Sequence, residues 1–517
     1  MRAQNNSPSP TQSWALQRHM KKSTNTLRIF RLVTLAGLYL AAWFTAPAAP
    51  QCTVDWMDVH QQIDGFGASS AFLTATWTAA QANMFFSTNS GIGLSLLRTQ
   101  IQPGGFTRAN EIALMRLAQA RGTRVWSTPW TPQASFKDNN STNGGNFVSA
   151  NNQAYANQLA GYVAQLSASS IKLYALSIQN EPDANVSYVS CHWSPQQFHD
   201  FIPYLYNALV ASNVGSTKIM LPESQSWYGT SLYTTAMNDA GVAALVGILG
   251  NHNYDGSDFN HGSTAVPNAP ETYGKPLWQT EVSTGNTFDG SITNAIYWAG
   301  RIHLFMTVAQ ANAWHYWWLI PWGGTDNQGL TDAAGNPAKR MYAVGQFSRF
   351  VRPNYHRIGA NTTQSAALIS AYKDTASPSF AIVAINPGNT AISQSFSLTN
   401  FMVSLVTPWV TSSSSSLAKQ NDITVANSTF TYALPAMSVV TFVGRAIFPS
   451  LNIQLTGSNG LRLSWPSPST GFTLQQNAKV ATTNWTTVGT TPTDDGTNKT
   501  VIVNPPAGNG FFRLIQP

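Results

Sequence analysis

Short apolar runs that end in polar residues recur along the middle of the chain. One run covers residues 173–178 and leads into Glu181, which is followed by Pro182. Runs of this length that stop at a helix breaker are typical of strands buried on both faces. A second run, at 275–282, has the same design and carries Glu281 near its end. The pattern predicts that each carboxylate stands at the carboxyl end of a buried strand.

The spacing of these two strand ends favours a barrel. About one hundred positions separate Glu181 from Glu281, which leaves room for about three β/α units. Apolar residues at helical spacing predict helices at 110–120 and 151–169, both before Glu181. Parallel barrels keep their chemistry at the carboxyl ends of the strands. We therefore predict an α/β protein with a (β/α)8 TIM barrel over residues 63–350.

Beyond the barrel the pattern changes to short strands. Residues 355–444 are rich in alternating and β-branched residues, which predicts an all-β region. Residues 447–517 contain further short strands at turn-rich intervals, which is typical of a small immunoglobulin-like sandwich. Within this C-terminal β-sandwich module we expect Trp465 and Trp485 to lie in the core.

The net charge of the chain is misleading. The formal charge is +7, but residues 1–49 hold six basic side chains and no acidic one. Removing those six leaves 22 basic and 21 acidic side chains, so the remainder is nearly neutral. A basic surface for nucleic acid is therefore not expected.

The first 49 residues have the features of a signal peptide. Basic residues precede an apolar run at 32–44, and small residues follow it at 46–49. The run is shorter than the roughly 20 residues that a membrane-spanning helix needs. We expect residues 1–49 to be removed on export, with Met20 as a second candidate start. The mature protein would be secreted and extracellular, without membrane attachment.

The chain has two cysteines, Cys52 and Cys191. Export would permit a disulfide between them, but the sequence does not show that they meet. No cluster of cysteine and histidine has the spacing of metal ligands, so no metal site is predicted.

Paired carboxylates at strand ends suit glycoside hydrolysis, which needs one acid and one nucleophile or base on either side of the cleaved bond. The segments Ser177–Pro182 (SIQNEP) and Leu277–Glu281 (LWQTE) resemble the acid/base and nucleophile strands of glycoside hydrolase clan A. The flanking sequence resembles family 30, most closely its subfamily 8 of bacterial xylanases. This resemblance implies that Glu181 is the acid/base and Glu281 the nucleophile.

The resemblance also implies roles for polar residues around the two glutamates. Asn180 would bind the 2-hydroxyl of the sugar. Arg98 would support the carboxylate of Glu281, although a salt-bridged structural arginine is the alternative. His252 and Tyr254 match the His-x-Tyr of the sixth barrel strand, where the phenol bonds the nucleophile. A buried core histidine is the alternative for His252.

Aromatic residues are expected to line the sugar cleft, because the C–H faces of a pyranose are apolar. The resemblance places Trp130 in that cleft, with a core position as the alternative. At 313–319 five rings follow one another. A strand period of two would turn inward either 314, 316 and 318 or 315 and 317. The family comparison favours Trp317. Glu223 would support the site without touching substrate.

The family pattern has two further consequences. It implies that residues 50–62 and 351–445 together form a β-sandwich beside the barrel. Subfamily 8 enzymes that require a glucuronic acid branch carry an arginine pair after the last barrel strand. Residues 319–324 read Leu-Ile-Pro-Trp-Gly-Gly instead. Because arginine's planar fork matches a carboxylate, its absence indicates that this enzyme does not need the branch.

These observations predict a secreted, monomeric, retaining endo-β-1,4-xylanase that needs no cofactor and acts on xylan-type polysaccharide without a strict need for glucuronic acid. The alternatives are another family 30 specificity (β-1,6-galactanase, β-1,6-glucanase or xylobiohydrolase) or a catalytically silent carbohydrate-binding protein.

Overall fold

The structure is a computed structural model that describes residues 51–255, 270–285, 287–322, 326–363, 365–457, 460–467, 469, 472–504 and 508–515. The predicted signal peptide at 1–49 lies outside these residues. In the part of the chain that is described, no helix has both the length and the apolar character needed to cross a membrane.

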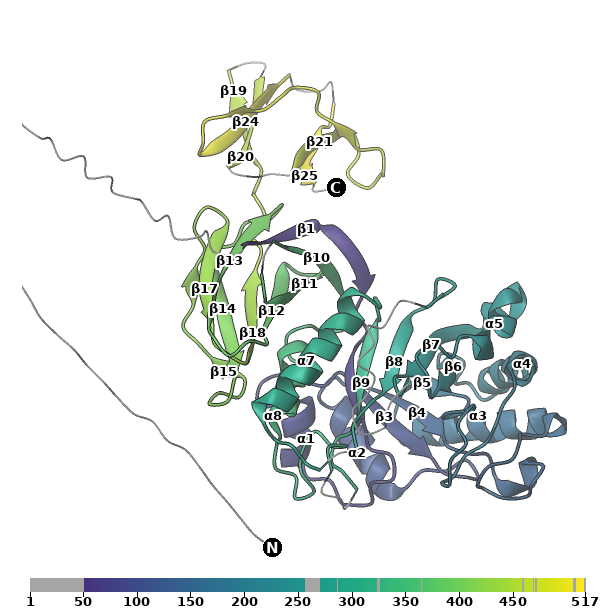
Figure 1. Cartoon of the computed structure of the whole chain (residues 1–517). Helices are drawn as coiled ribbons and strands as arrows, with labels where there is room; N and C mark the ends of the chain where they lie inside the picture. Colours follow the sequence, from purple (N-terminus) through teal and green to yellow (C-terminus); the bar gives the residue numbers. More distant parts are fainter. Residues whose placement is uncertain are drawn as a thin grey trace, which may run out of the picture. The chain divides into compact units, whose positions relative to one another are not determined.

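Eight parallel strands close into a barrel (Figure 1), which confirms the predicted TIM barrel. Each strand pairs with the next along the chain, and the last pairs with the first. The strands are β2 (Gly65–Ser69), β3 (Leu96–Ile101), β4 (Arg124–Pro129), β5 (Leu173–Ser177), β6 (Lys218–Ser224), β7 (Val246–His252), β8 (Leu277–Glu281) and β9 (Ala313–Trp318).

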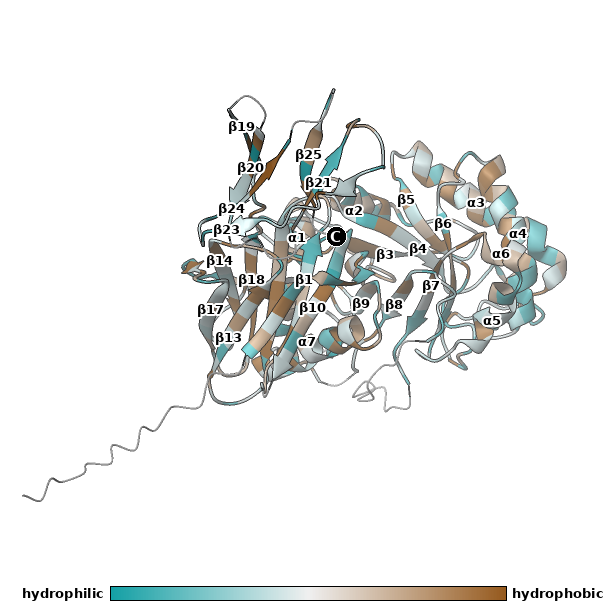
Figure 2. Cartoon of the chain, turned by 90° about the horizontal axis from the view of Figure 1, so that it is seen from above, coloured by the Kyte–Doolittle hydropathy of each residue, from teal (hydrophilic) through white to brown (hydrophobic). Residues whose placement is uncertain are grey.

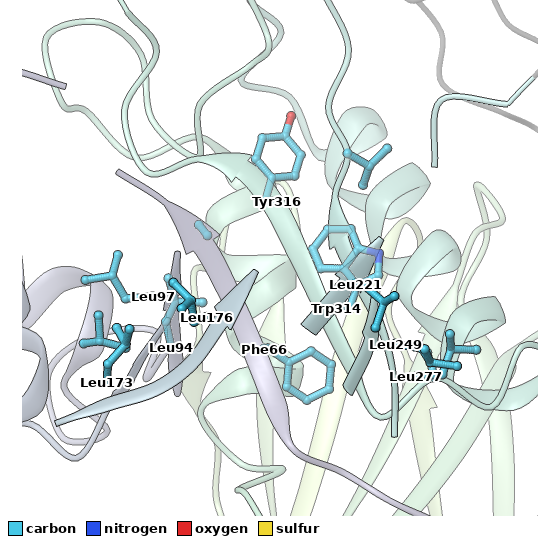
Figure 3. Close-up of a cluster of buried hydrophobic side chains, with 14 of the residues drawn as sticks. Phe66, Leu94, Leu97, Leu173, Leu176, Leu221, Leu249, Leu277, Trp314 and Tyr316 are labelled. Carbon is cyan, nitrogen blue, oxygen red and sulfur yellow. The ribbon is translucent and has the colours of Figure 1, made fainter. Parts of the chain in front are cut away.

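Helices cover the outside of the barrel, and apolar side chains fill the space between the two layers. Figure 3 shows this layer, with Leu97 and Leu176 among the side chains that point outward from the strands. In Figure 2 helices α3, α4 and α5 carry both hydrophobic and hydrophilic residues, as a half-buried helix does. The helices are α1 (Ala79–Phe86), α2 (Ala109–Gln119), α3 (Asn152–Ala168), α4 (Pro195–Ala211), α5 (Ser231–Asn238), α6 (Ala240–Ala243), α7 (Ile292–Thr307) and α8 (Lys339–Ser348).

A separate cluster fills the barrel interior below the site. Because strand side chains alternate, the neighbours of the outward leucines point inward. Seven strands each contribute one fully buried residue: Leu96, Trp126, Ala175, Met220, Ile248, Trp278 and Ala313. Strand β2 contributes Gly67 at this level, where a Cβ atom would overlap the ring of His315. This close approach explains why the first barrel strand carries a glycine.

Strand β1 and the nine strands β10 to β18 form one curled ten-stranded sheet beside the barrel. Strand β1 (Gln51–Gln62) lies between β10 and β13, so the segment before the barrel completes a sheet that follows it. Helix α8 contacts this sheet: Thr441 donates to the Gln346 carbonyl at 2.7 Å, and the Gln346 amide donates to Thr411 at 2.8 Å. The other strands are β10 (Tyr355–Thr363), β11 (Leu368–Asp374), β12 (Ser379–Asn386), β13 (Ile392–Thr399), β14 (Leu405–Thr411), β15 (Ala418–Lys419), β16 (Ile423–Thr424), β17 (Thr429–Leu434) and β18 (Ser438–Arg445).

The C-terminal strands form two small sheets with a core of their own. One has the order β19-β20-β24-β23 and the other β22-β21-β25. Trp465 is only 1% exposed within this core, as predicted, whereas Trp485 is partly exposed under Arg513. The strands are β19 (Asn452–Thr456), β20 (Gly460–Pro466), β21 (Thr473–Asn477), β22 (Thr486–Thr487), β23 (Thr493–Asp494), β24 (Asn498–Val503) and β25 (Phe511–Ile515).

The two cysteines do not meet. Cys52 lies in the core of the ten-stranded sheet and Cys191 in the layer around the barrel, and both are buried, unpaired thiols. The disulfide that the sequence left open is therefore not formed.

The interior cluster should dominate barrel stability. Replacing Trp278, which is fully buried there, by alanine should lower the free energy of unfolding by about 3–5 kcal/mol, because a large cavity is left. Tyr206→Ala, on the exposed side of α4, should change it by less than about 0.5 kcal/mol. Urea unfolding of both variants measures the difference. Equal losses would contradict the importance of the interior cluster.

Candidate active site

The predicted site residues converge at the carboxyl end of the barrel. Glu281 is the last residue of β8 and His252 the last of β7, while Asn180 and Glu181 follow β5. Arg98 lies in the middle of β3. Because the strands are parallel, their carboxyl ends open toward the same face, and residues far apart in sequence share one small volume.

Arg98 links the site together. It is fully buried, and its Nη1 donates to Glu281 Oε2. Its Nη2 donates to Asn180 Oδ1 at 2.6 Å and pairs with Glu223 Oε1 at 2.9 Å. The guanidinium also lies 4.6 Å from the centre of the Trp130 ring. The predicted contact between Arg98 and Glu281 is therefore present, and Glu223 shares the same cation.

His252 stands between all three glutamates. Its Nδ1 is 3.2 Å from Glu181 Oε1, and its Nε2 is 3.6 Å from Glu223 Oε1 and 3.7 Å from Glu281 Oε2. Burial lowers the pKa of His252, but the surrounding carboxylates outweigh burial and raise this pKa to about 9. The ring is therefore a cation at neutral pH. This differs from the alternative of a buried core histidine, which would be neutral.

The two candidate catalytic carboxyls are close to each other. One oxygen of Glu181 lies within 4.8 Å of one oxygen of Glu281. Tyr254 donates to Glu281 Oε1 at 3.0 Å, the contact that the family resemblance implied. On the other side, Tyr188 donates to Glu181 Oε2 at 2.5 Å.

These contacts displace the pKa values of the pair in opposite directions. Burial raises the pKa of Glu281, and the charge of Glu181 adds to this, against His252 and Arg98. Burial also acts to raise the pKa of Glu181, but His252 and the hydrogen bond from Tyr188 outweigh it and lower that pKa. In the free protein the proton shared by the pair therefore favours Glu281, and the two groups titrate together.

Charge balance explains why one proton stays in the site. Arg98 and His252 supply two positive charges, and Glu181, Glu223 and Glu281 would supply three negative ones. Burying an uncompensated charge is costly, so one carboxyl retains a proton. Glu223 is not that carboxyl: although burial acts against its ionised form, Arg98 and His252 lower its pKa to about 2.

Glu181, His252 and Glu281 could also be considered as metal ligands, because their ligand atoms lie close together. Their chemistry does not fit. A ligating histidine must be neutral, whereas His252 is held as a cation, and Glu281 already bonds Arg98.

Aromatic side chains line the cleft above the carboxylates. Its volume is about 230 Å³, and Trp130 and Trp317, both sequence candidates, form part of the wall. His315 instead points into the barrel, where Trp126 donates to it at 3.1 Å. Of the two alternating sets, 315 and 317 face inward and Trp314 and Tyr316 pack in the outer layer, but Trp318 departs from the alternation and also lines the cleft.

Five residues of the cleft wall were not among the predicted site residues: Phe72, Tyr188, Trp318, Trp322 and Gln328. Tyr188 and Phe72 lie on loops, and Phe72 adopts a left-handed φ of 65°. Trp318 follows Trp317 and packs on it with ring centres 4.6 Å apart. No motif marks Phe72 or Tyr188; only the density of aromatic residues near Trp318 was visible in the sequence.

Comparison with known proteins agrees with this geometry. The sequence profile of the glycosyl hydrolase family 30 TIM-barrel domain matches residues 111–342. The chain is 32% identical to the glucuronoxylanase XynC of Bacillus subtilis (strain 168) over 414 residues, which cover 77% of this chain and 92% of that protein.

Solved structures of family 30 xylanases are also similar to this chain. The family 30 subfamily 8 xylanase Xyn30A of Clostridium acetobutylicum has a TM-score of 0.68 and 35% identity, and covers 77% of this chain and all of that one. A family 30 endoxylanase of Clostridium papyrosolvens C71 has a TM-score of 0.65 and 32% identity over the same shares.

The hydrogen bond from Tyr188 gives a test of the charge network. This bond favours the ionised form of Glu181, so Tyr188→Phe should raise the pKa of Glu181. The pH range in which the pair holds one proton then moves upward, and the bell-shaped profile of kcat/KM should move with it. Tyr204→Phe, an exposed tyrosine on α4, should leave the profile unchanged. A downward shift for Tyr188→Phe would contradict this assignment.

Proposed function

The chain belongs to glycosyl hydrolase family 30, and we propose that within this family it is a secreted, retaining endo-β-1,4-xylanase that does not require glucuronic acid branches. The relatives named above are xylanases, which supports xylan as the polymer. We propose export because residues 1–49 have the sequence features of a signal peptide; the structure does not describe these residues.

The spacing of the two carboxyls carries the proposal of a retaining mechanism. Retaining glycosidases hold their carboxyl groups about 5–5.5 Å apart, whereas inverting enzymes leave about 6.5–9.5 Å for a water molecule. Oxygens of Glu181 and Glu281 within 4.8 Å of each other match the retaining class.

In the first step the Glu281 carboxylate attacks the anomeric carbon while Glu181 donates its proton to the glycosidic oxygen, which leaves with the aglycone. In the second step Glu181 takes a proton from water, and the resulting hydroxide displaces Glu281 from the sugar. The reaction requires the shared proton on Glu181, whereas the free site favours Glu281. Substrate binding must therefore move it: the glycosidic oxygen beside Glu181 can accept a hydrogen bond only from a protonated carboxyl, which favours the proton on Glu181.

Asn180 is oriented for the sugar 2-hydroxyl. Arg98 donates to its Oδ1, which fixes the amide so that Nδ2 faces Glu181, at 3.4 Å from Oε2. An Nδ2 group held beside the acid can donate to the neighbouring hydroxyl, and this bond strengthens as the oxocarbenium ion develops.

The cleft wall supports independence from glucuronic acid. Among the described residues that line it, none is an arginine; Trp322 stands there, 66% exposed and stacked on Phe72 with ring centres 6.3 Å apart. Gly323 and Gly324, the end of the segment that departs from the arginine pattern, lie outside the described residues. An exposed indole binds the apolar face of a sugar ring and needs no carboxylate on it.

Product analysis tests the proposed function. The protein should release xylo-oligosaccharides from unbranched xylan and from glucuronoxylan, without cleavage at a fixed distance from glucuronate. Glu281→Gln should release none, since the nucleophile is removed. Mass spectrometry identifies the products, and proton NMR should show the β-anomer first. Products only from β-1,6-glucan or β-1,6-galactan would overturn the substrate but not the catalytic pair, and an α-anomer formed first would overturn retention.

Trp322 should act in binding rather than in chemistry. Trp322→Ala should raise KM on unbranched xylan, with a loss of more than about 1 kcal/mol in binding, as for truncation of an aromatic side chain that dominates a binding surface, while kcat changes little. Trp322→Phe keeps a ring and should recover part of the affinity. A fall in kcat at unchanged KM would contradict a role in substrate stacking.

A further inference from the structure

A second pocket lies away from the cleft, where the end of α8 meets the ten-stranded sheet. Its volume is about 560 Å³, against about 230 Å³ for the catalytic cleft. Three arginines line it: Arg349 and Arg352, which follow α8, and Arg445, at the end of β18. This pocket, called the arginine pocket below, plays no part in the hydrolytic mechanism.

The arginine pocket lies at the opposite end of the barrel from the catalytic residues. Arg349 donates to the Asn89 carbonyl at 2.8 Å, and Arg352 donates to the Gly93 carbonyl. Both carbonyls belong to the loop that precedes β3, at the amino ends of the barrel strands. Glu181 and Glu281 stand at the carboxyl ends, so the two sites do not overlap.

The positive charge of the arginine pocket is oriented but not neutralised. In the described part of the chain none of the three arginines forms an ion pair with a carboxylate. Among the described residues, Arg445 donates to one side chain, the Ser379 hydroxyl, at 3.3 Å. Each guanidinium has five N–H donors, so the contacts with carbonyl and hydroxyl oxygens leave several available.

Two acidic groups lie near the arginine pocket: Asp422, which accepts a hydrogen bond from the Thr407 hydroxyl of its wall at 2.5 Å, and Asp374. Burial raises the pKa of Tyr355, and the charge of Asp374 adds to this, while Arg352 and Arg445 oppose it. The Asp374 oxygens accept hydrogen bonds within their own turn, from the Ala376 amide at 3.0 Å and the Ser377 hydroxyl at 2.6 Å. Asp374 therefore weakens the positive potential of the arginine pocket but forms no ion pair with its three arginines in the described part of the chain.

The rest of the wall combines apolar and hydroxyl groups. Leu405 is 45% exposed, and Phe350 and Tyr355 are partly buried beside it. Ser379, Ser404 and Thr407 add hydroxyls. A pyranose presents apolar C–H faces and hydroxyls together, and the volume lies in the range of small-molecule sites. An arginine fork adds recognition of a carboxylate.

We propose that the arginine pocket is a binding site for a uronic acid residue of a polysaccharide, separate from the catalytic cleft. The polymer that supplies this residue rests on the proposed function, whereas the recognition of a carboxylate-bearing sugar does not. The enzyme would then hold a decorated chain at one end of the barrel and cut an undecorated stretch at the other.

Calorimetric titration of the full chain tests this site. Glu281→Gln serves as the parent protein, so that no oligosaccharide is cut. The ligands are methyl glucuronoside, methyl xyloside and inorganic phosphate, at matched ionic strength. The glucuronoside should bind, the xyloside should not bind measurably, and phosphate should bind at least tenfold more weakly, because it has no apolar face. Equal binding of phosphate would overturn the assignment to a sugar, and equal binding of xyloside would overturn the role of the carboxylate.

Variants of the arginine pocket locate the binding. Arg445→Gln should weaken glucuronoside binding at least tenfold, and Leu405→Asp should do the same by placing a negative charge in the wall. Arg462→Gln, an exposed arginine of the C-terminal module, is the matched control and should bind like the parent protein. Circular dichroism verifies folding. In the enzyme with Glu281 intact, Arg445→Gln should still hydrolyse unbranched xylan at the normal rate. Unchanged glucuronoside binding in both pocket variants would overturn the proposal while leaving the hydrolase assignment intact.

Discussion

The site depends on one buried cation. Arg98 contacts residues that follow β5, end β6 and end β8, so its guanidinium joins three neighbouring parts of the barrel rim. A buried arginine is stable only when it is paired and hydrogen-bonded, and Glu223 and Glu281 provide this pairing. The same contacts fix the Glu281 carboxylate and the amide of Asn180 beside Glu181. Stability of the barrel rim and geometry of the reaction therefore share one interaction.

The second cation, His252, makes the protonation of the three carboxyls sensitive to their surroundings. His252 lies within 3.2–3.7 Å of all three carboxylates, so its charge acts on both members of the catalytic pair. Two cations against three carboxylates leave one proton to be shared by Glu181 and Glu281. Which oxygen holds it depends on small changes in solvation, such as the arrival of a sugar. A network with equal numbers of buried cations and carboxylates would have no proton to deliver.

The sequence was sufficient for the barrel and for the position of Glu181 and Glu281 at its carboxyl end, because both follow from local patterns: apolar runs that end in glutamate. It could not choose between the two alternating sets of rings at 313–319, since both faces of a barrel strand are buried. The structure decides by packing, with Trp314 outward and Trp317 in the cleft. The contact of Tyr188 with Glu181 could not be predicted from the sequence, because it depends on the path of a loop rather than on a strand pattern.

The charge network and the cleft wall are built from different parts of this chain. The charged network stands on barrel strands, where Arg98, His252 and Glu281 are at most 6% exposed and fixed by the barrel. The cleft wall comes from loops after β2, β5 and β9, and there Trp322 is largely exposed, with a ring stack on Phe72 as its contact to the wall. Tyr188, on the loop after β5, still bonds Glu181, whereas Phe72 and Trp322 meet through a ring stack. The Pro-Trp sequence after β9 therefore lies apart from the hydrogen bonds and ion pairs that hold the charge network.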